Sequence, residues 1–313
     1  MLIIALAALD ENRWQPWAYQ YTLMLAALVL APGGRAGLSD ERSAMRAVGT
    51  CGLIIVAIYF WSGLSKVNAA FRLEVLPFLL RPLVGEVPPV LAPVGYAVPA
   101  IEMAIGLGLV WRRTRRYAVA GAVLMHVSIL LAIGPLGSGW NTVVWPWNLA
   151  MIAFVLVVFW RLEATPARRL LPAVRAWPPA SRALAAAIAL LVVVMPVLNL
   201  FGWWGSHLSA ELYSGATIGG VVLPSREVSE RLPASARRHL ASTGNGPVLS
   251  LFNWAIDDLN VPAYSARRVF KRVGGELCAG TRSPRAPTLV VRERPDVLTG
   301  RRTVTAYRCE DLR

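Results

Sequence analysis

The chain has 313 residues, of which 56% are hydrophobic and 16% are charged, and it carries a formal net charge of +14 at pH 7. A soluble domain is expected to contain about 25% charged residues, so this composition excludes an ordinary soluble protein. The deficit in charge falls before residue 205, where apolar runs of roughly membrane-spanning length recur. We therefore predict an integral membrane domain at residues 1–204 and a soluble domain at residues 205–313.

The excess of basic residues does not indicate a nucleic-acid-binding protein. The arginines are divided between loops that flank the apolar runs and the C-terminal part, and no basic stripe is interleaved with aromatic residues. The three cysteines are too few for a disulfide-dense scaffold, and no pair of them has CxxC spacing. No set of His and Cys residues has the spacing of metal ligands, so we expect no metal site.

The apolar runs predict an all-α polytopic bundle of about six to seven spans. The opening run MLIIALAAL would rise only about 14 Å as a helix, against a hydrocarbon core of about 30 Å. It lacks a basic region and a small-residue cleavage site, so we interpret it as the end of a first helix and not as a signal peptide. The other predicted spans are residues 17–32, 45–64, 94–111, 117–135, 147–160 and 183–201, the second of these preceded by a cap at Ser39, Asp40 and Glu41.

The basic residues of alternate loops predict the orientation of the bundle. One set of loops carries twelve basic residues and the other carries four, so the first set is expected on the cytoplasmic side of the membrane. The last span then delivers the soluble domain to the extracytoplasmic side. The twelve are Arg35, Arg42, Arg46, Arg112, Arg113, Arg115, Arg116, Arg161, Arg168, Arg169, Arg175 and Arg182, and the four are Arg13, Lys66, Arg72 and Arg81.

Polar and aromatic residues gather at the predicted extracytoplasmic ends of the spans, as in the stretch NTVVWPWN at residues 141–148. An aromatic belt at a membrane interface occurs on both sides of a bundle, but it does not also bring Asn, Lys and Asp to one side. This asymmetry predicts a ligand-binding pocket in the outer leaflet. The residues expected to line it are Asp10, Arg13, Trp14, Asn68, Asn141, Trp145, Trp147 and Asn148.

Three ionisable residues are the candidate catalytic groups of the membrane domain: Lys66, Glu102 and His126. A charge near the centre of a bilayer costs at least about 2.5 kcal/mol, so such residues usually face the interior of a bundle and have a partner. Glu102 and His126 are equally distant from the turn centred on Thr114, so an antiparallel hairpin places them at equal depth and allows them to meet or to approach through a water. Helix-packing contacts remain the alternative interpretation of this pair, and snorkelling to the interface remains the alternative for Lys66.

The soluble part is predicted to be a small α+β domain. Short β-rich pieces occur at residues 219–223, 248–251, 288–292 and 303–307, and Phe270, Val273 and Leu277 recur at helical spacing. In an extracytoplasmic domain Cys278 and Cys309 would lie in an oxidising compartment, so we expect a disulfide between them and not a catalytic thiol pair.

Two stretches of the membrane domain carry a resemblance to a known family. The runs YFWSGLSKVNAAF and VPAIEMAIGLGLVWRRTRRYAVAGAVLMHVSILL resemble the DoxX/MauE-like family of bacterial membrane proteins over roughly residues 45–160. DENRWQPWAYQY and NTVVWPWNLAM resemble features of an uncharacterised subgroup. The residues that match the family pattern are Ser62, Gly63, Lys66, Glu102, Gly106 and Gly108.

The resemblance implies a helical bundle associated with redox processes. It points to the membrane subunit of a thiosulfate:quinone oxidoreductase, or to a helper in the maturation of a periplasmic amine dehydrogenase. The membrane domain of this chain lacks paired cysteines and has only Cys51, so direct disulfide exchange there is not expected. Whether the chain is itself an enzyme stays open.

Three hypotheses follow from the sequence. The first is a redox-associated membrane protein that binds a quinone or a similar amphipathic ligand in the outer-leaflet pocket, with no other cofactor implied. The second is a non-catalytic scaffold or maturation helper that binds an exported partner protein. The third is a transporter, which is disfavoured because no internal repeat is evident.

Overall fold

The computed structural model of the protein describes residues 2–30, 41–160, 177–244, 246–279 and 288–312. Its contacts divide the chain into unit 1, Met1–Val67 with Phe71–Ser214, and unit 2, Asn68–Ala70 with Gly215–Arg313. The division follows Ser214 and not residue 204, because Leu212 and Tyr213 pack against the helical core of unit 1. The loop arginines Arg35, Arg161, Arg168, Arg169 and Arg175 and the cap residues Ser39 and Asp40 lie outside the described residues.

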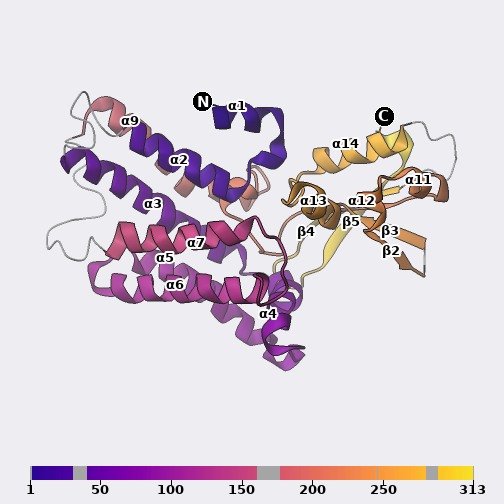
Figure 1. The fold of residues 1–313 in the computed structure, drawn as a ribbon, viewed down its shortest axis with the longest axis horizontal. Helices are drawn as coiled ribbons and strands as arrows, with labels where there is room; N and C mark the ends of the chain where they lie inside the picture. The colour runs from indigo at the N-terminus through magenta and orange to yellow at the C-terminus, as the bar shows by residue number, and fades with distance from the viewer. Residues whose placement is uncertain (1, 31–40, 161–176, 245, 280–287, 313) are drawn as a thin grey trace. The chain divides into compact units, whose positions relative to one another are not determined.

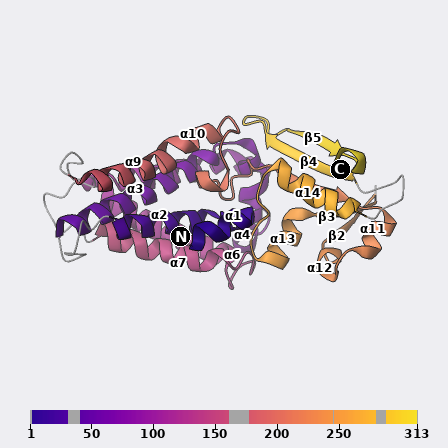
Figure 2. The same cartoon turned by 90° about the horizontal axis from the view of Figure 1, so that it is seen from above.

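Unit 1 is a helical bundle in which α3 packs along α2 and α5, and α6 packs along α5 and α7 (Figures 1 and 2). π-helical turns continue α7 through Leu156–Trp160 and join α9 to α10 through Leu190–Val194. The helices described are α1 (Leu2–Leu9), α2 (Pro16–Leu30), α3 (Glu41–Ser65), α4 (Leu76–Val84), α5 (Ala97–Gly108), α6 (Arg112–Ile133), α7 (Val144–Val155), α9 (Pro179–Ala189) and α10 (Met195–Asn199).

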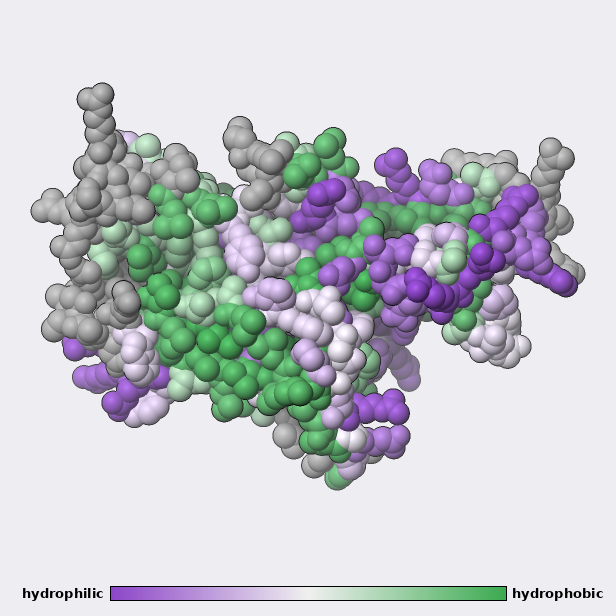
Figure 3. Space-filling model, viewed as in Figure 1, coloured by the Kyte–Doolittle hydropathy of each residue, from purple (hydrophilic) through white to green (hydrophobic). Residues whose placement is uncertain are grey.

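Three helical stretches among the described residues are long and apolar enough to cross a membrane. They are Ala44–Ser65, Arg112–Ile133 and Pro179–Asn199, and Ala97–Gly108 and Val144–Trp160 are shorter apolar helices. Hydrophobic residues cover the face of unit 1 over α6, as expected for a surface in contact with lipid (Figure 3). The composition-based prediction of a helical membrane domain is therefore confirmed.

The helix boundaries differ from the prediction in two places. The apolar run predicted as one span at residues 94–111 is divided, because residues 94–96 belong to the 3-10 helix Pro89–Tyr96 and α5 ends at Gly108. Residues 71–84 form a π-helical turn and α4, and no span or helix was predicted there. α4 begins with a proline at its second position and contains Pro82, which obscured its helical pattern in the sequence.

Two glycines allow α3 and α5 to approach closely. A Cβ atom at Gly63 would lie 2.9 Å from the carbonyl oxygen of Pro99, and one at Gly106 would lie 3.0 Å from the carbonyl oxygen of Val56. Both contacts are with backbone, which cannot yield without moving a helix, so any larger residue would separate α3 from α5. The close approach brings the C-terminal end of α3 within side-chain reach of the middle of α5.

The side chain of Arg115, in the first turn of α6, caps the C-terminal end of α5. Its Nε donates to the carbonyl oxygen of Leu109 at 3.0 Å, and its Nη2 donates to that of Val110 at 3.2 Å. These are carbonyls at the C-terminus of a helix, where a cation is favoured by the helix dipole. Arg115 is therefore buried in the helical hairpin, whereas the sequence indicated only a loop arginine.

Unit 2 is built on a five-stranded antiparallel sheet with strand order β2-β3-β1-β4-β5. The predicted stripe of Phe270, Val273 and Leu277 on α14 packs into the core formed with Val222 and Leu289 of the sheet. The sequence missed β2, a short strand with three exposed residues out of four. The strands are β1 (Gly219–Leu223), β2 (Leu240–Thr243), β3 (Gly246–Ser250), β4 (Thr288–Pro295) and β5 (Arg302–Tyr307), and the helices are α11 (Arg226–Arg231), α12 (Ala234–Arg237), α13 (Leu251–Leu259) and α14 (Arg267–Cys278).

A disulfide joins Cys278 at the end of α14 to Cys309 after β5. Both cysteines are buried, so the bond is enclosed in the domain and is not presented to a partner. It links the helix that covers the sheet to the last strand, which is a structural role.

Candidate functional site

A buried ion pair joins α3 to α5 inside unit 1. The Nζ of Lys66 lies 2.9 Å from one carboxylate oxygen of Glu102 and 3.2 Å from the other. The same ammonium group donates to the hydroxyl of Ser62 at 2.6 Å and to its carbonyl oxygen at 3.1 Å. Lys66 and Glu102 are 8% and 7% exposed, so Lys66 does not snorkel into solvent. The ammonium group thus has acceptors on both Ser62 and Glu102, within the bundle.

A second chain of hydrogen bonds runs through His126 of α6. Its Nδ1 lies 2.7 Å from the Oδ1 of Asn148, and its Nε2 lies 2.7 Å from the hydroxyl oxygen of Tyr59. The Nδ2 of Asn148 donates to the carbonyl oxygen of Val144, which leaves Oδ1 as the acceptor that faces the imidazole. Nδ1 must therefore carry a proton, and in the neutral ring Nε2 accepts from Tyr59. The chain joins α3, α6 and α7.

The expected contact between Glu102 and His126 is not what the structure shows. Equal distance from a turn fixes the depth of two residues, but it does not fix the direction in which each side chain leaves its helix. Glu102 faces Lys66 of α3, and His126 faces Tyr59 and Asn148. Glu102 is nevertheless close enough to act electrostatically on both Tyr59 and His126, so the two sets form one buried polar cluster.

The residues predicted to line an outer pocket make separate contacts of their own. Asp10 and Arg13 form an ion pair of 3.5 Å in which both side chains are largely exposed. The ring of Trp14 meets that of Tyr19 edge-on at 6.4 Å. Asn68 is buried, and it belongs to unit 2 and not to the bundle. These residues do not converge on one another.

The four predicted residues of the NTVVWPWN stretch also point in different directions. Asn141 donates to the hydroxyl of Tyr213 at 2.6 Å, and the indole of Trp145 donates to the carbonyl oxygens of Ile133 and Trp140. The indole of Trp147 donates to the Oε1 of Gln20 at 2.8 Å. Asn148 holds His126, so this stretch packs the bundle and does not form the wall of a shared pocket.

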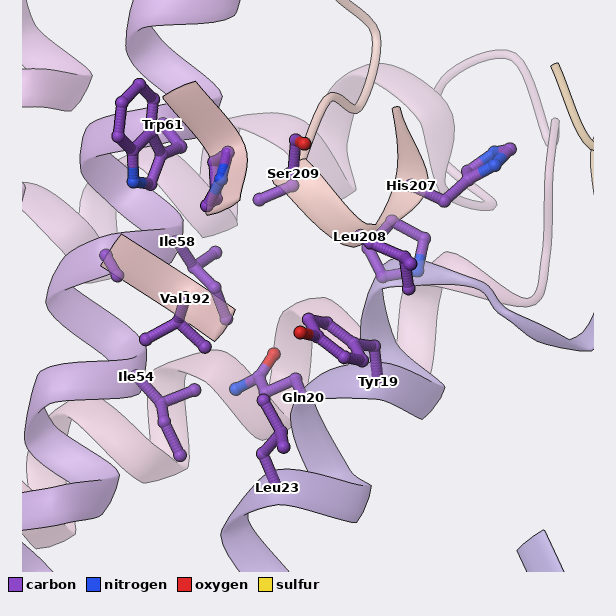
Figure 4. Close-up of a pocket in the computed structure, with 14 residues that line it drawn as sticks. Tyr19, Gln20, Leu23, Ile54, Ile58, Trp61, Val192, His207, Leu208 and Ser209 are labelled. Carbon is purple, nitrogen blue, oxygen red and sulfur yellow. The ribbon is translucent and has the colours of Figure 1, made fainter. Parts of the chain in front are cut away.

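A cavity does occur in unit 1, and none of the predicted pocket residues lines it. Its enclosed volume is small, about 20 Å³, and the cavity continues into open space at its mouth. Its walls come from α2, α3 and the chain between Val192 and Ala210 (Figure 4). The residues that line it are Pro16, Tyr19, Gln20, Leu23, Ile54, Ala57, Ile58, Trp61, Val192, Pro196, His207, Leu208, Ser209 and Ala210.

One residue in the sequence points to this cavity. Gln20 lies in the apolar run WAYQYTLML of a helix with no formal charge, and a polar amide at that position has to find partners inside the bundle. Tyr59, in the middle of α3, offered a similar signal for the chain of hydrogen bonds. His207 and Glu211 lie in a stretch of mixed composition, where no periodic pattern marks them as buried.

A third group of polar residues follows the last helix of unit 1. The Nδ2 of Asn199 donates to one carboxylate oxygen of Glu211 at 3.0 Å, and the hydroxyl of Ser214 donates to the other at 3.3 Å. Beside them, burial lowers the pKa of His207 to about 4. His207 is therefore neutral at physiological pH. These contacts hold the chain after α10 against the bundle.

The described residues contain no group of three or more His, Cys, Asp or Glu that could hold a metal ion. Cys51 is a free, buried cysteine in α3.

Comparison with known proteins agrees with the membrane character of unit 1. The family model described as methylamine utilisation protein MauE matches residues 44–143, which run from α3 through the loop before α7. The matched region contains Lys66, Glu102 and His126. No curated protein and no solved structure matches the chain. The chain is thus similar, over this third of its length, to a family of membrane proteins linked to methylamine utilisation.

Proposed function

We propose that the protein is an integral membrane component of a redox system, and that unit 1 holds a quinone or a similar amphipathic molecule. The observation that carries this proposal is the buried cluster of Lys66, Glu102, Tyr59, His126 and Asn148 within an apolar bundle. Ionisable groups are costly at membrane depth, and they usually mark an ion, proton or ligand pathway. The similarity to MauE, whose name refers to methylamine utilisation, supports a role beside an oxidative enzyme system.

The cluster suits the handling of protons near such a ligand. A bound quinone accepts two electrons and two protons, and the electrons would come from a redox partner protein. Glu102 and His126 can each hold or release a proton, and Tyr59 connects the imidazole to the neighbourhood of Glu102. Lys66 is the counter-ion of the Glu102 carboxylate, at 2.9 Å.

Purified full-length protein tests this proposal through its quinone content. We expect quinone in the organic extract of the wild-type protein and much less in the variants Glu102→Gln and Trp147→Ala. Trp111→Ala is the matched control, because Trp111 is exposed and is not part of the cluster. Wild-type protein that contains no quinone and binds none when it is added would contradict the proposal.

We propose further that the protein resides in the bacterial inner membrane with unit 2 on the extracytoplasmic side. The excess of arginine in one set of loops supports this orientation, and so does a disulfide in unit 2, since disulfides persist in oxidising compartments. A reporter fused after Arg313 that is active only in the cytoplasm would reverse the assignment.

A non-catalytic scaffold is the second candidate. Unit 2 is a folded, disulfide-bonded domain, and residues 215–313 contain 16 Arg or Lys against nine Asp or Glu, which suits an acidic exported partner. An exported protein that co-purifies with the full chain and is lost when residues 215–313 are deleted would favour this function. It would do so most clearly if the quinone content of the Glu102→Gln variant equalled that of the wild type.

A further inference from the structure

Two hydrogen-bond donors that are adjacent in α2 face the cavity of unit 1 without a good acceptor. The hydroxyl of Tyr19 is buried and has no hydrogen-bond partner among the described residues. Next to it, the side chain of Gln20 is 1% exposed. Figure 4 shows the two side chains directed into the same space, opposite Ile58 and Val192.

The surroundings of Gln20 fix the orientation of its amide. The indole of Trp147 is only a donor, so the atom that it contacts at 2.8 Å must be the oxygen, Oε1. Nε2 then faces the sulfur atoms of Met151 at 3.2 Å and Met24 at 3.8 Å. A thioether is a weak acceptor, so the two N–H groups of this buried amide are poorly satisfied.

Donors in this state are rare in folded proteins. Most buried polar groups have a partner, and one that lacks it indicates an unobserved water, ion or ligand. The buried cluster follows this rule, since Lys66, Tyr59, His126 and Asn148 all have partners at 3.2 Å or less. Tyr19 and Gln20 differ from that cluster, and both line a cavity of the bundle.

We propose that this cavity binds an apolar molecule through a carbonyl oxygen, which accepts hydrogen bonds from the hydroxyl of Tyr19 and the amide of Gln20. The body of the molecule lies against Leu23, Ile54, Ile58 and Val192, the apolar walls of the cavity. No positive charge is needed, and none of the cavity residues is charged at neutral pH. The ligand class is thus a neutral carbonyl compound with a hydrophobic body.

Two sources supply such a molecule in a membrane: the ring carbonyl of a quinone and the ester carbonyl of a lipid. The quinone rests on the proposed function, and in this cavity its carbonyl oxygen would lie beside Tyr19 and Gln20 of α2. The walls discriminate little between the two, because both present an apolar body. The carbonyl oxygen is the feature that they share.

The experiment uses full-length protein in detergent, and bound ligand is measured by native mass spectrometry. Decylubiquinone and phosphatidylglycerol are titrated in separate series. The variants are Tyr19→Phe and Gln20→Leu, alone and together, and Tyr21→Phe is the matched control, since Tyr21 lies on the same helix but does not line the cavity. We expect the affinity to fall about tenfold for each single variant and by less than about twofold for the control.

The outcomes separate this proposal from the proposed function. Binding of decylubiquinone that is weakened by the cavity variants supports both. If phosphatidylglycerol binds and the cavity variants weaken its binding, while decylubiquinone does not bind, the result supports the proposed cavity site and overturns the proposal that the protein holds a quinone. If the double variant binds decylubiquinone with unchanged affinity, the cavity is not the binding site and this proposal is overturned. The absence of binding in both series would overturn it as well. If the Gln20→Leu variant cannot be purified in a folded state, the affinity of Tyr19→Phe alone tests the proposal, because this substitution removes one oxygen atom and keeps the ring.

Discussion

The polar residues of α2 differ from those of α3, α5, α6 and α7 in one respect. The latter form closed sets, in which each donor faces an acceptor: Lys66 with Glu102 and Ser62, and His126 with Tyr59 and Asn148. On α2, Tyr19 and Gln20 line the cavity, and no oxygen atom of the described residues accepts a hydrogen bond from the Tyr19 hydroxyl or the Gln20 amide. The closed sets hold helices together, whereas the open one is complete only with a further molecule.

This difference leads to opposite expectations for substitution. Removal of one member of a closed set leaves its partner buried and unsatisfied, so the protein should lose stability. Removal of a donor that has no partner relieves a cost, so stability should not fall while ligand binding does.

The largest effect is expected when Glu102 is replaced by leucine. The charge of Lys66 would then remain buried without a counter-charge, and loss of one partner of a buried pair costs about 3–5 kcal/mol. The free energy of unfolding in detergent measures this loss. The double variant Lys66→Met/Glu102→Leu should recover most of it, and Glu86→Leu, at an exposed glutamate, is the control.

A pH titration should produce the next largest effect, through His207 in the cavity wall. Burial lowers its pKa to about 4, whereas an unfolded chain binds this proton near pH 6.5. Between these values the unfolded state holds more protons, so the free energy of unfolding falls as the pH falls through this window. The loss from this residue is about 3 kcal/mol at most, and it is absent above pH 6.5.

His207→Gln should flatten the pH dependence between pH 6.5 and 4, because glutamine does not titrate. A wild-type protein whose unfolding free energy is constant from pH 7 to pH 4.5 would show that the imidazole is not buried in its neutral form. His239 in unit 2 is partly exposed and serves as a comparison, through the variant His239→Gln.

A smaller loss is expected for Tyr59→Phe. The substitution removes the hydroxyl that contacts Nε2 of His126 at 2.7 Å and leaves that nitrogen buried without its partner. The cost of such an unsatisfied group is about 1–3 kcal/mol. Thermal unfolding monitored by circular dichroism would detect it, and an unchanged midpoint would indicate that a water replaces the hydroxyl.

Composition and periodicity predicted the helical character of unit 1 and the presence of a sheet in unit 2. The apolar runs identified most helices of unit 1, though not α4, and the spacing of Phe270, Val273 and Leu277 identified the face of α14 that packs on the sheet. Glu102 and His126 were predicted to be buried because each is an ionisable residue within an apolar run, and both are buried in the structure. These features depend on local sequence, which a single chain displays directly.

The partners of those groups could not be predicted, because they depend on how the helices are rotated. The sequence places Glu102 and His126 at one depth, but the close approach of α3 and α5 at Gly63 and Gly106 turns Glu102 towards Lys66. In the same way, the aromatic residues of the NTVVWPWN stretch bond to nearby backbone and to Gln20. Tyr19 was missed as a site residue because a tyrosine near the end of an apolar run usually belongs to an aromatic belt.

Replacement of Tyr19 by phenylalanine should differ most clearly from Tyr59→Phe, because it removes a hydroxyl from the open set and not from a closed one. Its expected effect on stability is the smallest of those considered. Tyr19→Phe removes a buried hydroxyl that has no acceptor among the described residues, so the ligand-free protein should keep its stability or gain up to about 1 kcal/mol. In the presence of ligand the order should reverse, because only the wild-type protein gains stability from the bound molecule. The difference in unfolding midpoint between wild type and variant, measured with and without added decylubiquinone, therefore reports directly whether the open donors of α2 are a binding site. A loss of 1 kcal/mol or more without ligand would mean that Tyr19 has a partner in the bundle, and the distinction between closed and open sets would no longer hold.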